Sequence, residues 1–353
     1  MTTRTPVPTK PSLRERLRRL PKTELHLHAL GSLRPATVVE LARAKNAPIL
    51  EAAEKGVARG YRFENLSTFV DFFIGLFGLV TTPAEFERVT FEILEDAALL
   101  GVRYIEPRWG PTSHLSRGAT VDGMWAGLEA GRRAAERAHG IVARWIVDFP
   151  RSLPVAVADE SEGIARATMN RRTVGFDIAG DERAVAADPK FAPVFRRARH
   201  DGLACVAHAG EAAGPESVVG ALDLYGATRI GHGTRSVEDA ALLARLVREG
   251  IPLEVCPTSN VKLNVVPSIA SHPIRRFLAA GVPVTISSDD PALFSTDILT
   301  EYELLHREAG ISLGTLARCA AQSFDMALLS KGERRERFTD TKREALAWAE
   351  ATT

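Results

Sequence analysis

The stretch PAEFERVTFEILEDAALLGVRYIEPRW, residues 83–109, contains the unit that decides the fold. Apolar side chains recur at three- and four-residue spacing through 83–100, which predicts a helix with one buried face. Gly101 follows, and glycine is the residue type favoured just past the end of a helix. The run 102–109 is short and apolar and predicts a strand. A helix packed against the strand that follows it is the building block of an α/β protein.

The same unit recurs along the chain. Short apolar runs predict strands at 24–29, 102–109, 142–149, 173–179, 203–209, 229–232, 252–257 and 282–287. Helical patterns lie between them, at 83–100, 121–139, 189–201, 216–225, 237–249 and 274–280. Eight alternations favour a closed (β/α)8 TIM barrel, of the α/β class, over an open doubly wound sheet. The glycine motif of a dinucleotide-binding sheet does not follow the first strand, which argues the same way.

The length of 353 residues is compatible with one large barrel or with two average domains. Neither a linker nor a repeat divides the sequence, so we expect a single domain over 1–353. Within it, 1–20 is read as a tail and a short helix, 30–100 as a helical insertion, and 312–353 as C-terminal helices, with two of them at 331–337 and 339–350. The insertion follows the first strand and so lies on the face where barrel active sites are found. We therefore expect it to form a lid.

Charge and cysteine content exclude several classes of protein. The chain has 45 Lys and Arg against 44 Asp and Glu, and a net charge of +1 gives no field that attracts nucleic acid or anionic lipid. Apolar runs of membrane-spanning length are absent from the sequence, and the N-terminus does not resemble a signal peptide. The three cysteines are not in CxxC spacing, which favours a reduced, cytoplasmic protein. The oligomeric state stays open.

Histidine and aspartate gather where the predicted strands end. The first strand ends in His26-Leu27-His28, and alternation places the two imidazoles on one side of it. His208, His232 and the pair Asp289-Asp290 end three further strands. All of these ends meet at one mouth of a barrel, so we expect a metal site there.

The types of ligand suggest which ion binds and what it does. Three imidazoles and a carboxylate suit one zinc ion per chain with an open position for water, and iron or cobalt stays possible. Zinc lowers the pKa of bound water to about 7, which indicates hydrolytic chemistry. Glu211 lies three residues past His208 and is a candidate acid if it is kept protonated. Cys256 is read as a packing residue.

Six ordered stretches together carry a family resemblance. They are Pro21–His28, Gly175–Glu182, His208-Ala209-Gly210-Glu211, Arg229-Ile230-Gly231-His232-Gly233, Cys256-Pro257-Thr258-Ser259-Asn260 and Ser288-Asp289-Asp290-Pro291. With these motifs the chain resembles the adenosine deaminase family of the amidohydrolase superfamily, whose members include adenosine, adenine and aminodeoxyfutalosine deaminases. The family fold is a (β/α)8 barrel, in agreement with the strand count.

The resemblance implies roles for individual residues. It implies that zinc is bound by His26, His28, His208 and Asp289. It further implies that Glu211 protonates N1 of an adenine ring, that His232 is a base beside the metal-activated water, and that Asp290 and the Gly180 N–H contact N7 and N3. Water then replaces the 6-amino group, which leaves as ammonia and gives a 6-oxopurine.

One departure from the family pattern concerns the sugar side of the substrate. After the second histidine the family has leucine, an acidic residue and glycine, whereas this chain has Ala29-Leu30-Gly31. The acidic residue is expected to hold the ribose 5′-hydroxyl, and Leu30 cannot accept a hydrogen bond. We therefore expect a zinc-dependent deaminase of adenosine or a 5′-modified adenosine. The alternatives are 6-aminodeoxyfutalosine, adenine or methyladenine nucleotides as substrates and, more distantly, another metal-dependent amidohydrolase.

Aromatic residues supply further candidate substrate contacts. Phe69 and Phe73 lie on one apolar helical face of the insertion and are expected to cover the sugar or its substituent, besides packing on the barrel. Trp109 ends the second strand, where it either stacks on a ligand or packs at the barrel top. His28 and Leu30 complete the expected substrate contacts. The expected partner is a small purine nucleoside or a derivative of one.

Overall fold

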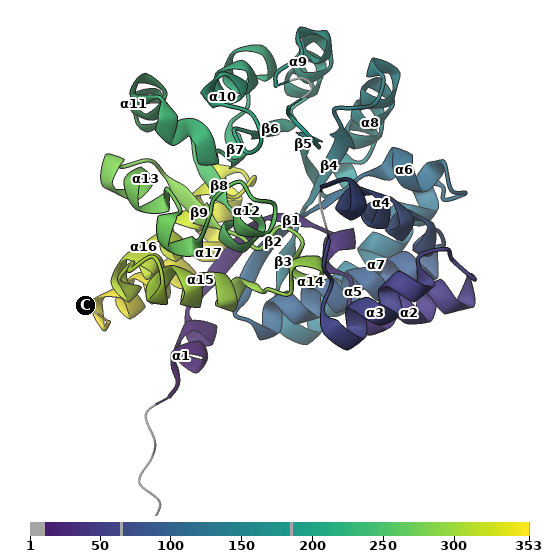
Figure 1. The fold of residues 1–353 in the computed structure, drawn as a ribbon, viewed down its shortest axis with the longest axis horizontal. Coiled ribbons are helices and arrows are strands. Elements are labelled where there is room, and N and C mark those ends of the chain that lie inside the picture. The colour runs from purple at the N-terminus through teal and green to yellow at the C-terminus, as the bar shows by residue number, and fades with distance from the viewer. Residues whose placement is uncertain (1–10, 64–65, 184–185, 353) are drawn as a thin grey trace, which may run out of the picture.

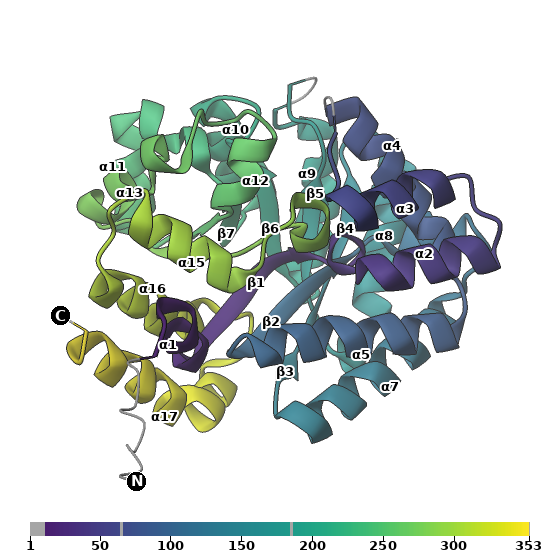
Figure 2. The same cartoon turned by 60° about the horizontal axis from the view of Figure 1, so that its bottom comes forward.

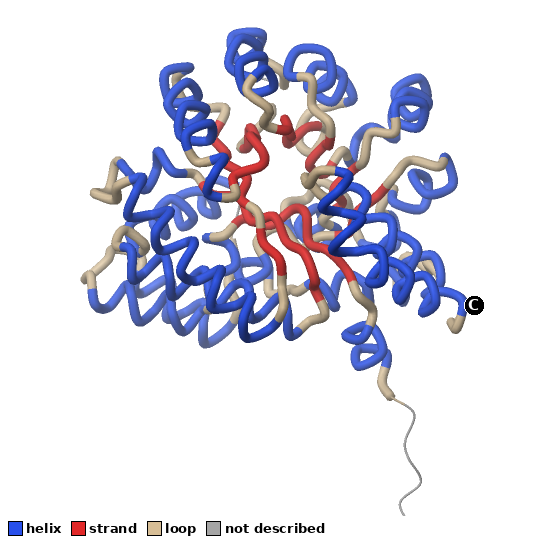
Figure 3. The backbone as a smooth tube through the Cα atoms, turned by 180° about the vertical axis from the view of Figure 1, so that it is seen from behind, coloured by secondary structure: helices blue, strands red, loops and turns tan. Residues whose placement is uncertain are grey.

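The computed structural model describes residues 11–63, 66–183 and 186–352 and shows a barrel of parallel strands surrounded by helices (Figures 1 and 3). The strands follow one another around the barrel in the order β1-β2-β4-β5-β6-β7-β8-β9, and β3 pairs with β2 beside β4. Their bounds are β1 Lys22–His28, β2 Val102–Trp109, β3 Val142–Ala143, β4 Trp145–Pro150, β5 Thr173–Ala179, β6 Ala204–Ala209, β7 Arg229–His232, β8 Leu253–Val255 and β9 Val284–Ile286. The expected eight-unit α/β barrel is confirmed.

The barrel closes between its first and last strands. Leu27 forms a parallel bridge with Asp289 just past β9, where the His28 N–H donates to the Asp289 carbonyl at 2.9 Å. In return the Asp289 N–H donates to the carbonyl of His26 at 3.2 Å. This closure brings the end of β1 next to the end of β9, although the two are far apart in the sequence.

Helices cover the outside of the strands (Figure 1), and the residues that they bury are mostly apolar. The insertion after β1 contains η1 Leu30–Ser32, α2 Pro35–Ala44, α3 Leu50–Arg59, α4 Leu66–Leu76 and η2 Phe77–Leu79, and it leads into α5 Pro83–Leu99. The later connections are α6 Pro111–Leu115, α7 Val121–His139, α8 Val155–Ala167, η3 Met169–Arg171, η4 Pro189–Phe191, α9 Ala192–His200, α10 Pro215–Gly220, η5 Ala221–Tyr225, η6 Thr234–Glu238, α11 Ala240–Glu249, α12 Pro257–Lys262, η7 Ile269–Ser271 and α13 Ile274–Ala280. None of the described helices combines the length and the apolar character needed to cross a bilayer.

The first and last described helices lie near each other, away from the insertion (Figure 2). The N-terminal helix is α1 Leu13–Arg19, and after β9 the chain forms α14 Pro291–Phe294, α15 Ile298–Arg307, α16 Leu313–Met326 and α17 Lys331–Glu350. The two helices expected at 331–337 and 339–350 are one continuous helix. Phe338 lies between the two expected segments and belongs to this helix. Its ring is buried against Phe324 and Tyr104, with centroids 5.1 and 5.6 Å away.

A network of paired, charged side chains lies in the middle of the barrel. Arg108 on β2 bonds Asp177 at 2.6 Å and Glu254 at 2.5 Å, while Arg229 on β7 bonds Glu106 at 2.6 Å and Glu254 at 2.5 Å. All five side chains are at most 2% exposed. Buried charges persist only when they are paired and hydrogen-bonded. We call these five residues the charged floor, and the metal-ligand candidates lie directly against it.

Candidate active site

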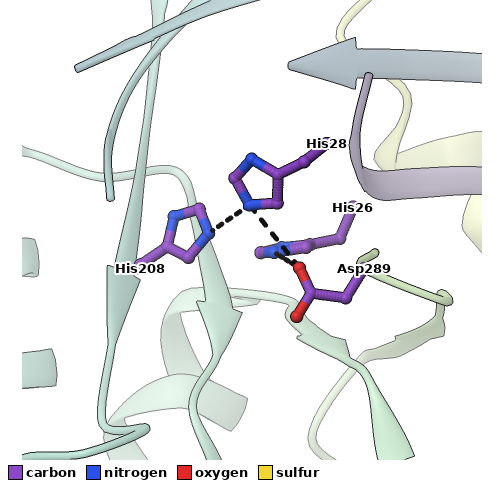
Figure 4. Close-up of side chains that lie close together, drawn as sticks. All are labelled: His26, His28, His208 and Asp289. Carbon is purple, nitrogen blue, oxygen red and sulfur yellow. Dashed lines mark hydrogen bonds and ion pairs between the residues drawn. The ribbon is translucent and has the colours of Figure 1, made fainter. Parts of the chain in front are cut away.

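Four side chains from three distant parts of the chain converge at the strand ends (Figure 4). His26 and His28 come from β1, His208 from β6, and Asp289 from the turn after β9. The Nε2 atoms of His28 and His208 are 3.1 Å apart, and Asp289 Oδ1 lies 3.2 Å from His26 Nε2 and 3.5 Å from His28 Nε2. One donor atom from each residue lies within 4.8 Å of all the others. This spacing suits shared coordination of a single ion.

The charged floor orients the most deeply buried of these imidazoles. His26 Nδ1 lies 2.8 Å from Glu254 Oε2. Burial alone would raise the pKa of Glu254, but the guanidiniums of Arg229 and Arg108 hold it well below the usual range. The carboxylate is therefore ionised and fixes the proton of His26 on Nδ1. Nε2 is left with its lone pair toward the cluster.

The other two imidazoles have the same arrangement. His28 Nδ1 lies 3.4 Å from Asp148 Oδ2, and His208 Nδ1 lies 3.2 Å from Asp177 Oδ2. A histidine that ligates a metal through one nitrogen usually donates its other N–H to a carboxylate or carbonyl, which sets the tautomer and the ring orientation. All three imidazoles thus carry the outer support that is typical of metal ligands.

Unpartnered atoms at the centre of the cluster test whether a metal fits. Among the described residues, His26 Nε2 and Asp289 Oδ1 are buried and lack a hydrogen-bond partner. The second Asp289 oxygen accepts a hydrogen bond from Ser259 at 2.6 Å. Buried polar atoms are normally satisfied, so two orphans 3.2 Å apart indicate that a cation belongs between them. Three imidazole nitrogens and a carboxylate oxygen match the donors that zinc prefers.

The pKa values of the imidazoles indicate how protons and an ion compete for the cluster. Burial lowers the pKa of His208 to about 4, so this ring is neutral and free to coordinate. Burial acts the same way on His28, but the carboxylates of Asp290 and Asp148 outweigh it and raise its pKa to about 9. A cation bound among these carboxylates displaces that proton, as metal binding to histidine requires.

Cys256 and His232 form a second group with His26 and Asp289, with ligand atoms within 4.8 Å of one another. Burial, followed by the charges of Asp289 and Glu254, raises the pKa of the Cys256 thiol well above its usual range. The thiol is fully buried and contacts the carbonyl of Glu254 at 3.7 Å, which is compatible with the packing role expected of Cys256.

Two of the six described non-glycine residues with a positive φ angle lie in the site. His232 and Asp289 adopt φ angles of 60° and 66°, in the left-handed region that non-glycine residues rarely occupy. A close approach accompanies this strain, because a Cβ at Gly231 would lie 2.8 Å from His26 Cε1. Such conformations persist where the surroundings impose them, and they cluster at functional sites.

Glu211 lies on the loop after β6, which a second glutamate holds in place. Glu182 accepts hydrogen bonds from the N–H groups of Gly210 at 2.9 Å and Ala213 at 3.2 Å. The Glu211 side chain is 17% exposed, and its Oε1 lies 3.6 Å from His232 Nδ1. Burial, together with nearby carboxylates, raises the pKa of Glu211 well above its usual range. The loop thus presents a protonated carboxyl at the mouth.

Asp290 is buried beside the ligand cluster, and among the described residues its Oδ1 lacks a hydrogen-bond partner. Burial, and next the charge of Asp289, raises the pKa of Asp290 well above its usual range, so that it is a hydrogen-bond donor. Its carboxyl occupies the space that a side chain at Gly31 would need, since a Cβ there would lie 1.8 Å from Oδ1.

Gly31→Ala therefore displaces the Asp290 carboxyl. We expect kcat/KM to fall by about tenfold to a hundredfold, because a shift of about 1 Å in a positioned group has an effect of this order. Steady-state kinetics measure the change. Gly163→Ala is the matched control, since a Cβ there meets no atom within 4 Å. Unchanged kcat/KM in Gly31→Ala would contradict the role given to this contact.

Four of the remaining substrate-contact candidates, Gly180, Leu30, Phe69 and Phe73, lie near the strand ends or in the insertion. Gly180 directly follows β5 and has a φ of 94°, and Leu30 is buried in η1, just past the candidate ligands of β1. The Phe73 ring lies 6.1 Å from the ring of His28, and Phe69 stacks on Phe294 at 5.3 Å, so the insertion reaches the metal-ligand cluster.

The structure does not bring Trp109 to the mouth. Its neighbour Arg108 points into the barrel, and strand alternation turns Trp109 outward. There it is 2% exposed and packs on Phe86 and His114, with centroids 5.8 and 5.9 Å away. The packing role explains this side chain.

Sequence patterns did not predict a function for five residues of the site: Asp148, Asp177, Glu254, Ser259 and Asn260. A signal was present for the three acids, because each interrupts an apolar strand with a charge that has to be buried. Their partners lie on other strands, so the sequence does not show which histidine each one orients. Asn260 lies within hydrogen-bonding distance of both His232 and Glu211, at 3.3 and 3.5 Å.

Comparison with known proteins gives a family match. The model of the family described as adenosine deaminase matches residues 21–341. An aminodeoxyfutalosine deaminase of Streptomyces coelicolor is 39% identical over 312 residues, 88% of this chain and 80% of that protein. An adenine deaminase of Rhodospirillum rubrum is 35% identical over 321 residues, 91% of this chain and 95% of that protein.

Solved structures agree with the fold. An adenine deaminase from Arthrobacter aurescens superimposes with a TM-score of 0.86 at 31% identity, covering 94% of this chain and 99% of the other. An amidohydrolase from Burkholderia ambifaria with bound Zn gives a TM-score of 0.89 at 28% identity, covering 99% and 97%. The N6-methyl-AMP deaminase of Arabidopsis thaliana gives 0.82 at 27% identity, covering 94% and 98%.

Proposed function

This chain belongs to the adenosine deaminase family and is a deaminase of adenine-like substrates, and from that premise we propose a more specific activity. It removes the 6-amino group of an adenine ring whose ribose carries a bulky, weakly polar 5′ substituent, as in 6-aminodeoxyfutalosine. The products are the 6-oxopurine and ammonia. The expectation of plain adenosine is less well supported, because the similar proteins are named aminodeoxyfutalosine and adenine deaminases.

The proposed cofactor is one zinc ion per chain, held by His26, His28, His208 and Asp289. Its support is the donor set, the two orphaned atoms at the centre and the carboxylate behind each imidazole. Zinc, when bound, supplies a water molecule that ionises near neutral pH.

Protein groups bind and polarise the purine in this proposal. The protonated Glu211 carboxyl gives its proton to ring N1, which makes C6 electron-poor. The protonated Asp290 carboxyl donates a hydrogen bond to N7, and the N–H of Gly180 donates to N3. His232 stands 3.6 Å from Glu211, and its Nδ1 lies 3.3 Å from the amide nitrogen of Asn260. We therefore propose that it orients the attacking group, in place of the base role that the resemblance implies.

One observation carries the choice of substrate: a buried leucine stands where the family pattern has an acidic residue. Leu30 is 3% exposed and offers neither a donor nor an acceptor to a ribose hydroxyl. Phe69 and Phe73 of the insertion add aromatic surface at the same end of the barrel. Apolar walls favour a substituent that replaces the polar 5′-hydroxyl.

Free adenine is the second candidate. The Phe73 ring lies only 6.1 Å from the ring of the candidate ligand His28, so the insertion approaches the metal closely. A substrate without a sugar fits under such a cover. Several similar proteins are adenine deaminases, including one from Streptomyces coelicolor that is 38% identical over 320 residues.

The proposal also includes the organisation of the chain and its location in the cell. The whole chain, 1–353, forms one catalytic domain with the segment 30–100 as its lid. The buried, unpaired thiols of Cys205, Cys256 and Cys319 suit the reducing cytoplasm.

A substrate panel tests the proposed activity. Adenosine, its 5′-deoxy and 5′-thio analogues, adenine, AMP and 6-aminodeoxyfutalosine are each incubated with the zinc-loaded protein. Loss of the adenine absorbance band and release of ammonia report deamination. The proposal expects the highest kcat/KM for 6-aminodeoxyfutalosine. A higher value for adenine selects the second candidate, and a higher value for adenosine overturns the argument from Leu30.

Leu30→Asp tests that argument directly. We expect the ratio of kcat/KM for adenosine to that for the 5′-modified substrate to rise by about tenfold or more, since a hydrogen bond to a charged group contributes about 1.5–3 kcal/mol. Competition kinetics with both substrates measure the ratio. Leu30→Met is the control, because it conserves volume and adds no acceptor. An unchanged ratio in Leu30→Asp would remove the specificity role of this position.

A further inference from the structure

Asn260 occupies the space between the candidate acid, the neighbouring histidine and a second, more distant histidine. It lies on α12 and is fully buried. Its Nδ2 lies 3.3 Å from His232 Nδ1 and 3.5 Å from Glu211 Oε1. Its Oδ1 lies 3.0 Å from Thr234 Oγ1 and 3.2 Å from His272 Nε2. A single amide therefore connects two active-site groups with two residues outside the mouth.

The direction of these hydrogen bonds is set at their far end by the backbone. The Ile274 N–H, which can only donate, points to His272 Nδ1 at 3.2 Å. Nδ1 is thus the acceptor of His272, and in a neutral imidazole the other nitrogen then carries the proton. Burial lowers the pKa of His272 to about 4, so the ring is neutral near pH 7. Nε2–H therefore donates to Asn260 Oδ1.

This donation fixes which way the amide faces. Asn260 Oδ1 receives hydrogen bonds from His272 and from the hydroxyl of Thr234. A flipped amide would set its NH2 group against the N–H of His272 and leave its oxygen facing Glu211 Oε1. Unsatisfied buried groups of this kind are costly, and all of these side chains except Glu211 are buried. The NH2 group is thereby held toward the mouth.

The orientation of the Asn260 amide determines the hydrogen-bonding roles of both His232 and Glu211. His232 Nδ1 faces a donor, so it keeps its lone pair, and Nε2 is the nitrogen that is left to carry a ring proton. Glu211 Oε1 faces the same NH2 group and acts as an acceptor. The acidic proton of Glu211 is therefore placed on Oε2.

We propose that Asn260 is a positioning residue of the deamination reaction, locked by His272 and Thr234, which fixes the tautomer of His232 and the carboxyl orientation of Glu211. This inference rests on the proposed function for its kinetic consequence. Its structural content, the tautomer of His232, does not depend on any substrate.

Paired variants outside the mouth separate positioning from packing. His272→Phe removes the donor to Asn260, whereas His272→Gln keeps an N–H donor in a similar place. Thr234→Val removes the other donor, and Thr234→Ser keeps it. We expect kcat to fall by about fivefold to tenfold in the Phe and Val variants, with KM within about twofold of wild type and zinc content unchanged. The Gln and Ser variants should retain kcat close to wild type.

A spectroscopic measurement tests the tautomer without substrate. Protein labelled with ¹⁵N-histidine and loaded with zinc gives imidazole nitrogen shifts that distinguish Nδ1–H from Nε2–H, and a His232→Gln sample assigns the signal of His232. The expected result is Nε2–H in wild type and in His272→Gln, and a mixture of tautomers in His272→Phe. A wild-type His232 that carries its proton on Nδ1 overturns the proposal, as do equal losses of kcat in His272→Phe and His272→Gln. If the protein deaminates none of the purines tested, the proposed function fails, and the nitrogen shifts still decide this inference.

Discussion

Glu211→Gln lowers kcat by about 10²–10⁴-fold, the range that a positioned general acid contributes. The carboxyl of Glu211 is kept protonated because it is buried near other carboxylates and its pKa is raised. Glutamine preserves the shape and can still donate a hydrogen bond to a ring nitrogen, but it cannot transfer a proton. Stopped-flow or steady-state loss of adenine absorbance measures the effect.

Three further measurements test whether the loss of activity in Glu211→Gln comes from the missing proton. Zinc content should stay at the wild-type level, because Glu211 does not belong to the four-ligand group. Glu216→Gln, an exposed change just beyond the same loop, should retain wild-type turnover. The acid form of Glu211 disappears as pH rises through its pKa, so wild-type activity should decline on the alkaline side. Wild-type turnover in Glu211→Gln would show that the proton comes from another group.

Asp289→Ala removes both the metal and the activity. Asp289 supplies the only carboxylate of the four-ligand group, and its Oδ1 is one of the two orphaned atoms at the centre. Its loss should weaken zinc binding by more than the roughly 10- to 100-fold that removal of an outer hydrogen-bond partner costs. Metal analysis after dialysis, followed by activity with increasing added zinc, measures both effects.

Ser259→Ala provides a graded comparison for this variant. The Ser259 hydroxyl donates to the other Asp289 oxygen at 2.6 Å, and Ser259 is not itself one of the four candidate ligands. We expect zinc affinity to fall by roughly 10- to 100-fold, with activity restored at higher zinc concentration. A chelator should abolish wild-type activity, and added zinc should restore it. An Asp289→Ala protein that keeps a full complement of zinc would contradict the assigned ligand set.

The fold could be predicted because its signals are local. The helix pattern of 83–100, the turn at Gly101 and the apolar run of β2 lie next to one another, and the observed strand has the expected bounds. The strand predicted at 142–149 was harder to place, because the chain is interrupted at Arg144 and forms two strands, β3 and β4. Arg144 is buried and extends to Glu333 at 3.1 Å, a partner that no local pattern reveals.

The site was predictable only where the topology brings residues together. His26 and His208 end strands of the same barrel, so their convergence follows from the strand count alone. Glu254 and Asp177 also lie on strands, but their importance comes from contacts across the barrel with His26 and with His208. The amide of Asn260 depends on η7 and α13, which approach from outside the strands. Such partnerships depend on packing distances that the order of residues does not contain.

The charged floor also affects how the protein comes to hold its ion. Three carboxylates, Glu106, Asp177 and Glu254, face only two guanidiniums there, and Asp289 adds a further negative charge above them. Without a cation, the proton that His28 holds offsets only part of this negative charge, and the buried remainder lowers the free energy of unfolding. A cation that binds only the folded barrel returns that stability by mass action. The proposed zinc ion would therefore also act as a counter-ion, and its removal by a chelator should lower the free energy of unfolding as well as the activity.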